Sequence, residues 1–343
     1  MSTPPTPRPA LPASFRWPSG FRAAACFTFD LDAESPILWE HPEAAGYLDV
    51  MTHQAYGPRT GLYRLLRLLD RVGIRATFFV PGFTAERWPD AVRAIHEAGH
   101  EIAHHGYLHE SARGATPEEE ERRLLRGLEA LDRVAGVRPV GYRAPFWAMS
   151  WTTPALLARH GFRYDSSLMD ADHPYRLAVF HEPAGPSLVE LPVQWALDDW
   201  EPYVYLPGLS GSGVIESPRA VLERWRLEFE GLVEDGGLFV LTNHPFVSGR
   251  PSRAQALETL IRDVQDTPGV WIATCVEVAA HVEGLSLAPV VHRRPEVDGV
   301  ERPSDRPASR EGAGHPSTAG EGFAVADGGD GQQGGRGDRG GHP

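Results

Sequence analysis

The sequence predicts an α/β fold in which a parallel sheet is covered by helices. Short apolar runs alternate with segments of helical periodicity, and about seven such units follow one another between residues 20 and 284. No fingerprint of a change in strand order interrupts this rhythm, and the number of units favours a closed or nearly closed barrel. A doubly wound open sheet is the alternative that the same alternation permits.

Seven apolar runs are predicted to be strands and six periodic segments to be helices. Helix 61–73 has apolar residues at i, i+3, i+4 and i+7 and a glycine at its end. The helix from Thr116 to Val134 begins with an N-cap residue, a proline and an acidic first turn. The other predicted helices are 89–98, 153–160, 217–233 and 252–264, and the predicted strands are 23–29, 76–80, 101–103, 140–143, 162–165, 238–242 and 270–274.

The chain is predicted to hold one catalytic barrel between two disordered ends. From residue 285 onward the sequence is rich in Pro, Arg and Glu and then in Gly, so it cannot bury enough apolar surface to offset the entropy of ordering. Residues 1–19 are expected to be disordered as well. The predicted boundaries are therefore 1–19, 20–284 and 285–343.

Composition excludes several classes of function. A net charge of −13 argues against a general nucleic-acid binder, and all 33 basic residues are Arg, which excludes a Schiff-base, pyridoxal-phosphate or Walker A lysine. No apolar run approaches the roughly 18 residues of a membrane helix, and no secretory signal is visible, so we expect a cytoplasmic protein without a membrane partner. Cys26 and Cys275 lie in apolar runs and are expected to be free thiols.

Residues that can bind a metal follow two predicted strands. Asp30 and Asp32 end the first strand at the strand period of two, so their side chains point the same way, and His105 and His109 follow strand 101–103. The carboxyl ends of barrel strands meet on one rim. Asp32, His105 and His109 are a typical three-ligand set for a catalytic zinc, so we predict one divalent ion, with Zn²⁺ as the first choice among several that such a site accepts.

The remaining polar residues on this rim supply a hydrolytic mechanism. A bound divalent ion lowers the pKa of water to about 7 and polarises a carbonyl oxygen. Asp30 is then the predicted general base and Arg143 holds it, while His244 is the predicted general acid and Asp165 orients it.

Each of these residues also has a purely structural interpretation. A His-x-x-x-His pair arises by chance among fifteen histidines, an Asp-x-Asp at a strand end is commonly a turn or helix cap, and His244 and Arg143 could serve only a loop and an ion pair. Their joint occurrence on successive strand ends favours the catalytic interpretation. The irregular segment 170–213 is predicted to set specificity. Four tryptophans near the rim line a pocket or belong to the core: Trp147, Trp151, Trp195 and Trp200.

The chain resembles the polysaccharide deacetylases, the NodB-homology or family 4 carbohydrate esterases, over roughly residues 20–284. Five segments carry the resemblance in order: Thr28-Phe29-Asp30-Leu31-Asp32, His105 to His109, Arg143-Ala144-Pro145-Phe146-Trp147, Tyr164-Asp165-Ser166-Ser167 and Asn243-His244-Pro245. In the family's first motif one Asp is the base and the other a metal ligand. The resemblance implies a distorted (β/α)7 barrel that is usually zinc-bound.

The first motif departs from the usual form, because Leu31 separates two aspartates that are usually adjacent. The spaced form is similar to the branch that contains the Helicobacter-type peptidoglycan deacetylase, the metal-free allantoinases and the cyclic imide hydrolases, a branch that forms homo-oligomers. The presence of Asp32, His105 and His109 argues against a metal-free member.

Three functions follow from these observations. The first is a metal-dependent amide hydrolase that removes an acetyl group from an N-acetylated sugar. The second keeps this chemistry but opens the ring of a small cyclic imide or ureide, which suits a chain without a visible export signal. The third is a carbohydrate-binding protein that has kept the barrel and lost turnover.

Overall fold

The computed structural model describes residues 14–181, 185–211 and 213–296, which fall within one compact unit, Met1–Val297. The N-terminal disorder predicted for residues 1–13 and most of the predicted tail, residues 297–343, lie outside the described residues.

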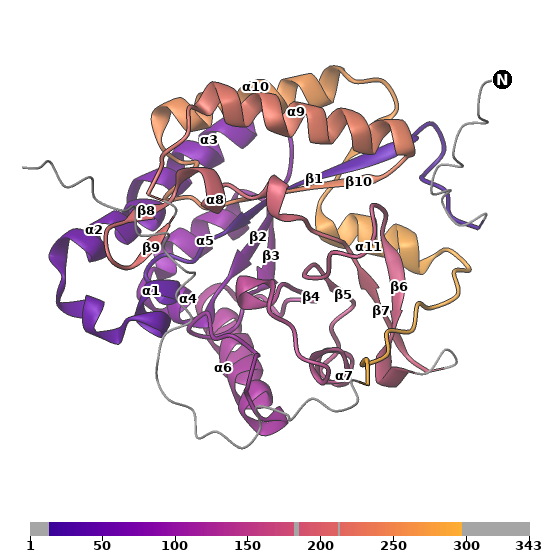
Figure 1. Ribbon diagram of the computed structural model, residues 1–343, viewed down its shortest axis with the longest axis horizontal. Helices are drawn as coiled ribbons and strands as arrows, with labels where there is room; N and C mark the ends of the chain where they lie inside the picture. Colours follow the sequence, from indigo (N-terminus) through magenta and orange to yellow (C-terminus); the bar gives the residue numbers. More distant parts are fainter. Residues whose placement is uncertain (1–13, 182–184, 212, 297–343) are drawn as a thin grey trace, which may run out of the picture. The chain divides into compact units, whose positions relative to one another are not determined.

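A curled, predominantly parallel sheet forms the centre of this unit, as predicted. Within the described residues it has nine strands in the order β10-β1-β2-β3-β4-β5-β7-β6 (Figure 1), with β11 also paired to β1. All pairings are parallel except that of β6 with β7, and the described strands at the two ends of this order, β10 and β6, are not paired with each other. The strands are Ala23–Asp30 (β1), Thr77–Val80 (β2), Glu101–His104 (β3), Gly141–Tyr142 (β4), Tyr164–Asp165 (β5), Tyr175–Ala178 (β6), Ser187–Glu190 (β7), Leu238–Asn243 (β10) and Val270–Ile272 (β11), and a separate hairpin joins Tyr205–Leu206 (β8) to Ser210–Gly211 (β9).

Strand β1 is the axis of the sheet. All eight of its residues are buried, and it pairs with β10 along one edge and with β11 and then β2 along the other. The register places the carboxyl ends side by side, with Phe29 opposite Asn243 and Asp30 opposite Phe79. On the far side His104 lies opposite Tyr142, which in turn lies opposite Asp165. One rim of the sheet therefore receives all the polar residues that follow these strands.

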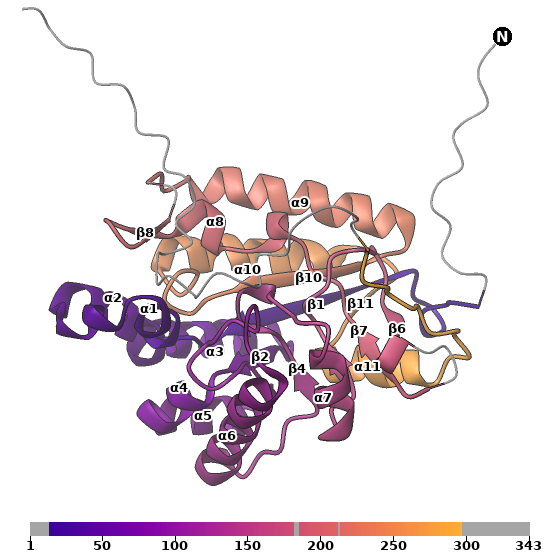
Figure 2. The ribbon, with the colours of Figure 1, turned by 60° about the horizontal axis from the view of Figure 1, so that its bottom comes forward.

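Helices cover the sheet on its outer side. In Figure 2 helices α9 and α10 lie together along β1 and β10, and α4, α5 and α6 lie on the side of β2. Helix α5 also contacts β3. The helices are Ser35–Glu40 (α1), Leu48–Tyr56 (α2), Leu62–Val72 (α3), Gly82–Arg87 (α4), Pro89–Glu97 (α5), Pro117–Ala135 (α6), Thr153–Arg159 (α7), Trp200–Tyr203 (α8), Pro218–Asp235 (α9), Pro251–Asp266 (α10) and Cys275–Glu283 (α11).

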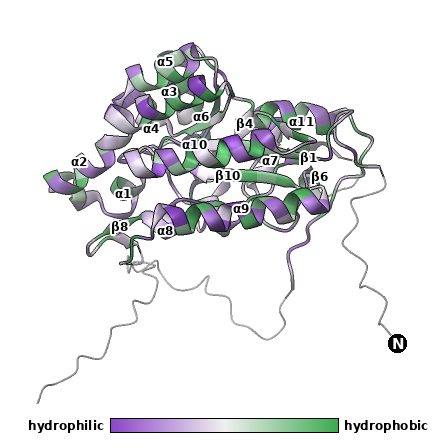
Figure 3. Cartoon of the chain, turned by 90° about the horizontal axis from the view of Figure 1, so that it is seen from above, coloured by the Kyte–Doolittle hydropathy of each residue, from purple (hydrophilic) through white to green (hydrophobic). Residues whose placement is uncertain are grey.

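The helix signals in the sequence are confirmed. Helix α6 has the predicted N-cap at Thr116, which exchanges hydrogen bonds with Glu119 in a capping box, and ends at Gly136 in the left-handed conformation. Figure 3 shows apolar and polar stripes along α9 and α10, and the buried residues of α10 are Ala254, Leu257, Leu260, Ile261 and Val264. Burial of such a stripe against the sheet, rather than helix propensity, supplies most of the stability of these helices. No helix of the described residues is both long and apolar enough to cross a membrane.

The segment 170–213 contains more regular structure than the sequence indicates. Its strand β7 is a parallel member of the central sheet, and β6 adds to it as an antiparallel edge. The apolar pattern is hard to recognise because β7 has only four residues and ends with a buried glutamate, Glu190. This segment therefore contributes a strand pair to the sheet and then the short elements that lead to α8.

The packed body extends beyond the predicted limits of 20 and 284. Phe15 and Trp17 are buried, and Trp17 donates a hydrogen bond from Nε1 to the carbonyl oxygen of Gly236 at 2.7 Å. At the other end Leu285 and Leu287 are buried, and Val290 pairs with Leu177 of β6. The predicted boundaries are thus too narrow, because a few apolar residues within polar ends suffice to hold them against the core. Cys26 and Cys275 are free and buried, as expected.

A π-helix, Gly57–Gly61, joins α2 to α3 and packs directly on the loop that follows β10. A Cβ atom on Gly61 would lie 1.9 Å from the carbonyl oxygen of Pro245, and one on Gly249 would lie 2.4 Å from the Cα of Gly61. Only glycine permits this approach of two backbones.

We therefore expect Gly61→Ala to lower the free energy of unfolding by about 1–3 kcal/mol, because the loop after β10 must shift to admit the methyl group. The matched control is Gly231→Ala in α9, where a Cβ atom meets nothing within 4 Å and the better helix former should add about 0.5–1 kcal/mol. Urea denaturation of both variants measures the difference, and equal stabilities would contradict the packing described.

Candidate metal centre

The loop after β1 fixes the backbone of Asp32 and leaves its carboxylate free. The carbonyl oxygen of Asp32 accepts hydrogen bonds from the Ser35 hydroxyl at 2.7 Å, the Ser35 amide at 3.1 Å and the Thr84 hydroxyl at 2.7 Å. The next residue, Ala33, has a φ of 50°, which is unusual for a residue with a side chain. The three hydrogen bonds hold this strained turn in place.

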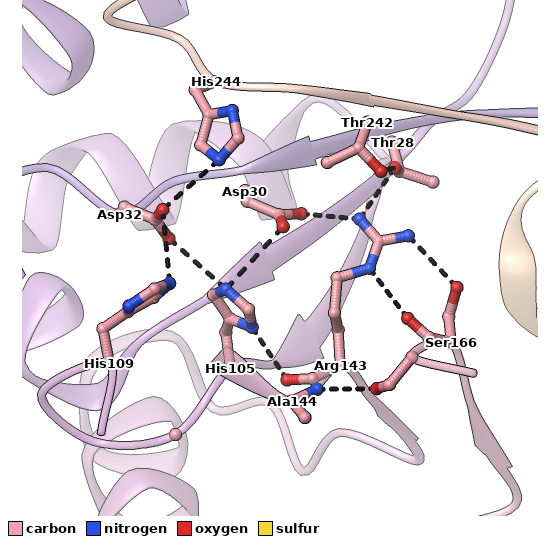
Figure 4. A network of polar contacts seen from close by, with 12 residues as sticks. Thr28, Asp30, Asp32, His105, His109, Arg143, Ala144, Ser166, Thr242 and His244 are labelled. Carbon is pink, nitrogen blue, oxygen red and sulfur yellow. Dashed lines mark hydrogen bonds and ion pairs between the residues drawn. The ribbon is translucent and has the colours of Figure 1, made fainter. Parts of the chain in front are cut away.

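The two histidines that follow β3 face Asp32 (Figure 4). The Nε2 atom of His105 lies 3.6 Å from Asp32 Oδ1, and that of His109 lies 3.6 Å from Asp32 Oδ2. His105 is oriented by a hydrogen bond from Nδ1 to the carbonyl oxygen of Arg143, at 2.7 Å. That bond places the ring proton on Nδ1 and leaves a lone pair on Nε2. His109 adopts a positive φ of 58°, so the backbone is strained at this second ligand too.

These three residues fit a divalent cation. One ligand atom from each lies within 4.8 Å of the others, and all three residues are buried. Both carboxylate oxygens of Asp32 are buried without a hydrogen-bond donor from the described residues, which is costly for a charged group. Burial raises the pKa of Asp32 to about 6 and lowers the pKa of His109. A cation would satisfy the orphaned oxygens and accept the lone pairs of neutral imidazoles.

Arg143 is bound to Asp30, as predicted. Its Nη1 atom donates to Asp30 Oδ1 at 2.8 Å and to the Thr28 hydroxyl at 2.9 Å, and the guanidinium is fully buried. The other oxygen of Asp30, Oδ2, faces the ligands and lies 3.7 Å from His105 Nε2. Arg143 thus holds one side of this carboxylate and leaves the other side toward the candidate metal centre.

His244 completes the group from the loop after β10. Its Nε2 atom lies 3.5 Å from Asp32 Oδ2, and its Nδ1 atom lies 2.6 Å from Asp199 Oδ1. Asp199 also accepts hydrogen bonds from the His244 amide and the Ser248 hydroxyl. Burial by itself would lower the pKa of His244, but the carboxylates of Asp199 and Asp198 outweigh it and raise that pKa well above the usual range.

The prediction that Asp165 orients His244 is wrong. Strands β5 and β10 are separated in the sheet by β1, β2, β3 and β4, so the two side chains follow distant strands. Asp199 can reach His244 because its neighbour Asp198 forms a β-bridge with Thr242 at the end of β10. The acidic residues at 198 and 199, within the irregular segment, were the only sequence signal for this contact. Asp165 instead accepts a hydrogen bond from the Ser167 hydroxyl at 2.9 Å.

A second group of possible ligands, Asp198, Asp199 and His244, is explained by hydrogen bonds instead. Asp198 Oδ1 accepts the amide of Trp200 at 2.7 Å, and both oxygens of Asp199 have donors. His104, which adjoins the centre in sequence, packs away from it, with Nε2 3.0 Å from the carbonyl oxygen of Leu124. Burial lowers the pKa of His104 to about 3, so this ring is neutral.

Aromatic rings wall the centre. Phe146 packs edge-on against His109 with ring centroids 4.3 Å apart, and Trp200 packs against His244 at 5.3 Å. Trp147 contacts Trp195 at 4.5 Å, and both Phe146 and Trp147 have positive φ angles. Of the four tryptophans predicted near the rim, Trp151 and Trp195 are exposed, Trp200 is half-buried and Trp147 is buried. The polar residues behind these rings are almost inaccessible: Asp30, Asp32, His105, His109 and His244 are 3%, 1%, 1%, 5% and 6% exposed.

Comparison with known proteins finds related sequences. A family model described as polysaccharide deacetylase matches residues 55–164. The peptidoglycan deacetylase of Helicobacter pylori is 32% identical over 253 residues, which are 67% of this chain and 86% of that protein. The peptidoglycan deacetylase-like protein FGM2 of Gibberella zeae is 30% identical over 289 residues, 75% of this chain and 86% of that protein.

The fold also matches a solved structure. A crystal structure described as that of a putative polysaccharide deacetylase from Mycobacterium smegmatis superposes with a TM-score of 0.81 and 54% sequence identity. The match covers 84% of this chain and 100% of the other. The curled sheet and its helices are therefore shared across most of both chains.

The metal-free form should carry a measurable pH signature. Because burial raises the pKa of Asp32 from 3.8 to about 6, the folded chain binds this proton more tightly than the unfolded chain does. Stability is then lost as pH rises from about 4 to about 6, by an amount on the order of 1–3 kcal/mol. We expect Asp32→Asn to remove this loss, so that the metal-free variant is more stable than the wild type at pH 7.

With zinc bound, the wild type should instead be more stable than Asp32→Asn at pH 7, since zinc stabilises only the chain that retains its ligands. Thermal melts of metal-free and zinc-loaded protein give both comparisons, with Glu101→Gln as the control because its carboxyl group accepts from Thr77 and Tyr164 at the opposite end of β3. Equal zinc stabilisation of the wild type and Asp32→Asn would count against the site.

Proposed function

This chain belongs to the polysaccharide deacetylase family, and from that membership we propose that it removes an acetyl group from an N-acetylated sugar by metal-dependent hydrolysis of the amide bond. The observation that carries the proposal is the buried, donor-free carboxylate of Asp32 between the imidazoles of His105 and His109. Beside it lie the carboxylate of Asp30 and the imidazole of His244, each fixed by a hydrogen bond to its own partner. The Helicobacter pylori relative is described as a peptidoglycan deacetylase and the matching family model as polysaccharide deacetylase, which agrees with this chemistry.

Asp32, His105 and His109 would hold the cation, and we propose zinc because this set is typical of catalytic zinc sites. When bound, the cation lowers the pKa of water and polarises the acyl oxygen of the substrate.

Asp30 is the proposed general base. Arg143 and Thr28 fix its orientation, and the free oxygen Oδ2 faces the ligands, where it can take a proton from the attacking water. The oxygen of that water forms a bond to the acyl carbon. The bond between this carbon and the nitrogen of the sugar then breaks.

His244 is the proposed general acid. Asp199 accepts a hydrogen bond from its Nδ1 atom and stabilises the protonated ring. The Nε2 atom then carries a proton on the side of Asp32 and can deliver it to the leaving nitrogen. The amine and acetate are the products, and the proton taken by Asp30 balances the one that His244 gives up. The rings of Phe146 and Trp200 restrict the access of other water to these groups.

A second candidate, ring opening of a small cyclic imide or ureide, is favoured by one observation. The five polar residues of the centre are at most 6% exposed, a depth that suits a compact substrate better than a long polysaccharide chain. The same base, acid and ligands would act on a cyclic amide bond. A cytoplasmic location and a homo-oligomeric state remain predictions for fractionation and light scattering.

Turnover of a substrate panel tests the function. Zinc-loaded full-length protein is incubated with oligomers of N-acetylglucosamine and, separately, with cyclic imides and ureides. We expect release of acetate from the first group, loss of this activity in Asp30→Asn, and retention in Glu101→Gln. Ring opening without acetate release would select the second candidate, and release of neither product would refute both.

The pH dependence of kcat tests Asp199, in place of the sequence-predicted Asp165, as the partner of His244. Because the imidazolium must donate a proton, activity is lost as pH rises through the raised pKa of His244. Asp199→Asn removes the largest charge that raises this pKa, so we expect the alkaline limb to move to lower pH and kcat to fall at least about tenfold. Asp165→Asn should leave the alkaline limb in place, and the reverse result would restore Asp165 as the partner.

A further inference from the structure

Asp165 and Glu190 form a buried pair of carboxyl groups that the proposed reaction does not use. They are direct partners in the register of the parallel strands β5 and β7, and both residues are fully buried. Each has one oxygen, Oδ2 of Asp165 and Oε2 of Glu190, without a donor among the described residues. As direct partners in the register, the two side chains project from the same face of the sheet, so two buried carboxyl groups with donor-free oxygens are neighbours. Two ionised carboxylates so placed repel each other, whereas one shared proton gives both groups a partner.

The contacts of Glu190 suit a protonated carboxyl group. Its Oε1 atom accepts the amides of Ser167 at 3.1 Å and Leu168 at 2.9 Å, which leaves Oε2 to donate toward Asp165. Burial and the neighbouring Asp165 charge raise the pKa of Glu190 well above its usual range. Asp165 is then the carboxylate, and its Oδ1 atom accepts the hydroxyl of Ser167.

The pair fixes the turn that holds Arg143. Arg143 donates from Nε to the carbonyl oxygen of Ser166 and from Nη2 to the Ser166 hydroxyl, both at 3.1 Å. Ser167 accepts the amide of Ala144, the residue after Arg143, at 2.8 Å. The hydrogen bonds of two of the three guanidinium nitrogens are therefore made to a turn that is itself bound to Asp165 and Glu190. The third nitrogen, Nη1, binds Asp30.

We propose that Glu190 is a positioning residue for the general base: it shares one proton with Asp165, and the pair holds the turn at 166–168 so that Arg143 presents Asp30 to the metal centre. This role rests on the proposed function. Glu190 does not touch the reacting atoms, and it acts through Ser166, Ser167 and Arg143. A glutamine at this position can reproduce both the donor and the acceptor of a protonated carboxyl group, whereas an alanine can reproduce neither.

Steady-state kinetics of Glu190→Gln and Glu190→Ala test the role on zinc-loaded full-length protein. We expect Glu190→Gln to keep kcat within about threefold of the wild type. Glu190→Ala should lower kcat at least about tenfold with KM and zinc content unchanged, because a misplaced base affects only the chemical step. The matched control is Glu101→Ala, which removes a carboxyl group bound to Thr77 and Tyr164 at the other end of the sheet and should lower stability but leave kcat unchanged.

Three results would overturn the proposal. They are an unchanged kcat in Glu190→Ala, an equal loss in Glu190→Gln and Glu190→Ala, or a loss of kcat in Glu101→Ala as large as that in Glu190→Ala. If Glu190→Ala does not fold, Glu190→Gln decides the outcome by infrared spectroscopy. The difference spectrum between the wild type and Glu190→Gln should show the carbonyl band of a protonated carboxylic acid at neutral pH, and the difference cancels the bands of other buried carboxyl groups such as Asp198. Absence of that band from the difference spectrum would refute the shared proton.

The infrared readout needs no substrate and can be made on metal-free protein, so it separates this inference from the proposed function. A wild type that hydrolyses no member of the panel would remove the function and with it the positioning role. An active wild type with no carboxylic acid band in the difference spectrum would leave the function standing and refute only the part assigned to Glu190.

Discussion

The burial of one carboxylate without a hydrogen-bond donor is the constraint on which the site depends. Asp32 is 1% exposed, and from the described side chains its oxygens meet only imidazole nitrogens at 3.5–3.6 Å. A charge in such surroundings costs several kcal/mol unless a cation accompanies it. The fold nevertheless keeps Asp32 there, with its backbone carbonyl tied by Ser35 and Thr84 and with strained residues at Ala33 and His109. Strain of this kind persists where the surrounding structure over-determines it and is concentrated at functional sites.

The two groups that would transfer protons, Asp30 and His244, have partners of opposite charge. Asp30 is paired with the guanidinium of Arg143, whereas His244 is paired with the carboxylate of Asp199. The negative partner favours the protonated imidazole that a general acid requires, and the guanidinium holds one oxygen of Asp30 while the other faces the ligands. The partners come from opposite sides of β1: Arg143 follows β4, and Asp199 is joined to β10 through the bridge of Asp198 with Thr242. The order of strands in the sheet thus sets the chemistry of the site.

Much of this arrangement could be predicted from the sequence. The alternation of apolar runs and periodic segments gives the parallel sheet, the capping box at Thr116 gives a helix start, and the rule that strand ends share a rim brings Asp32, His105 and His109 together. Those inferences depend on local patterns. The partner of His244 could not be found in this way, because the choice between Asp165 and Asp199 depends on which loop crosses to β10. Strand β7 was hidden for a related reason: its buried Glu190 is stabilised by a residue on another strand, which no local pattern records. Phe15 and Leu285 extend the core from ends whose overall composition is polar.

The position of a bound metal tests the central claim most directly. Crystals of the protein soaked with zinc would be measured at the zinc absorption edge. We expect one anomalous peak about 2.0–2.2 Å from an oxygen of Asp32 and from Nε2 of His105 and His109. A peak between Asp198, Asp199 and His244 instead, or no peak at Asp32 in crystals that contain zinc elsewhere, would contradict it.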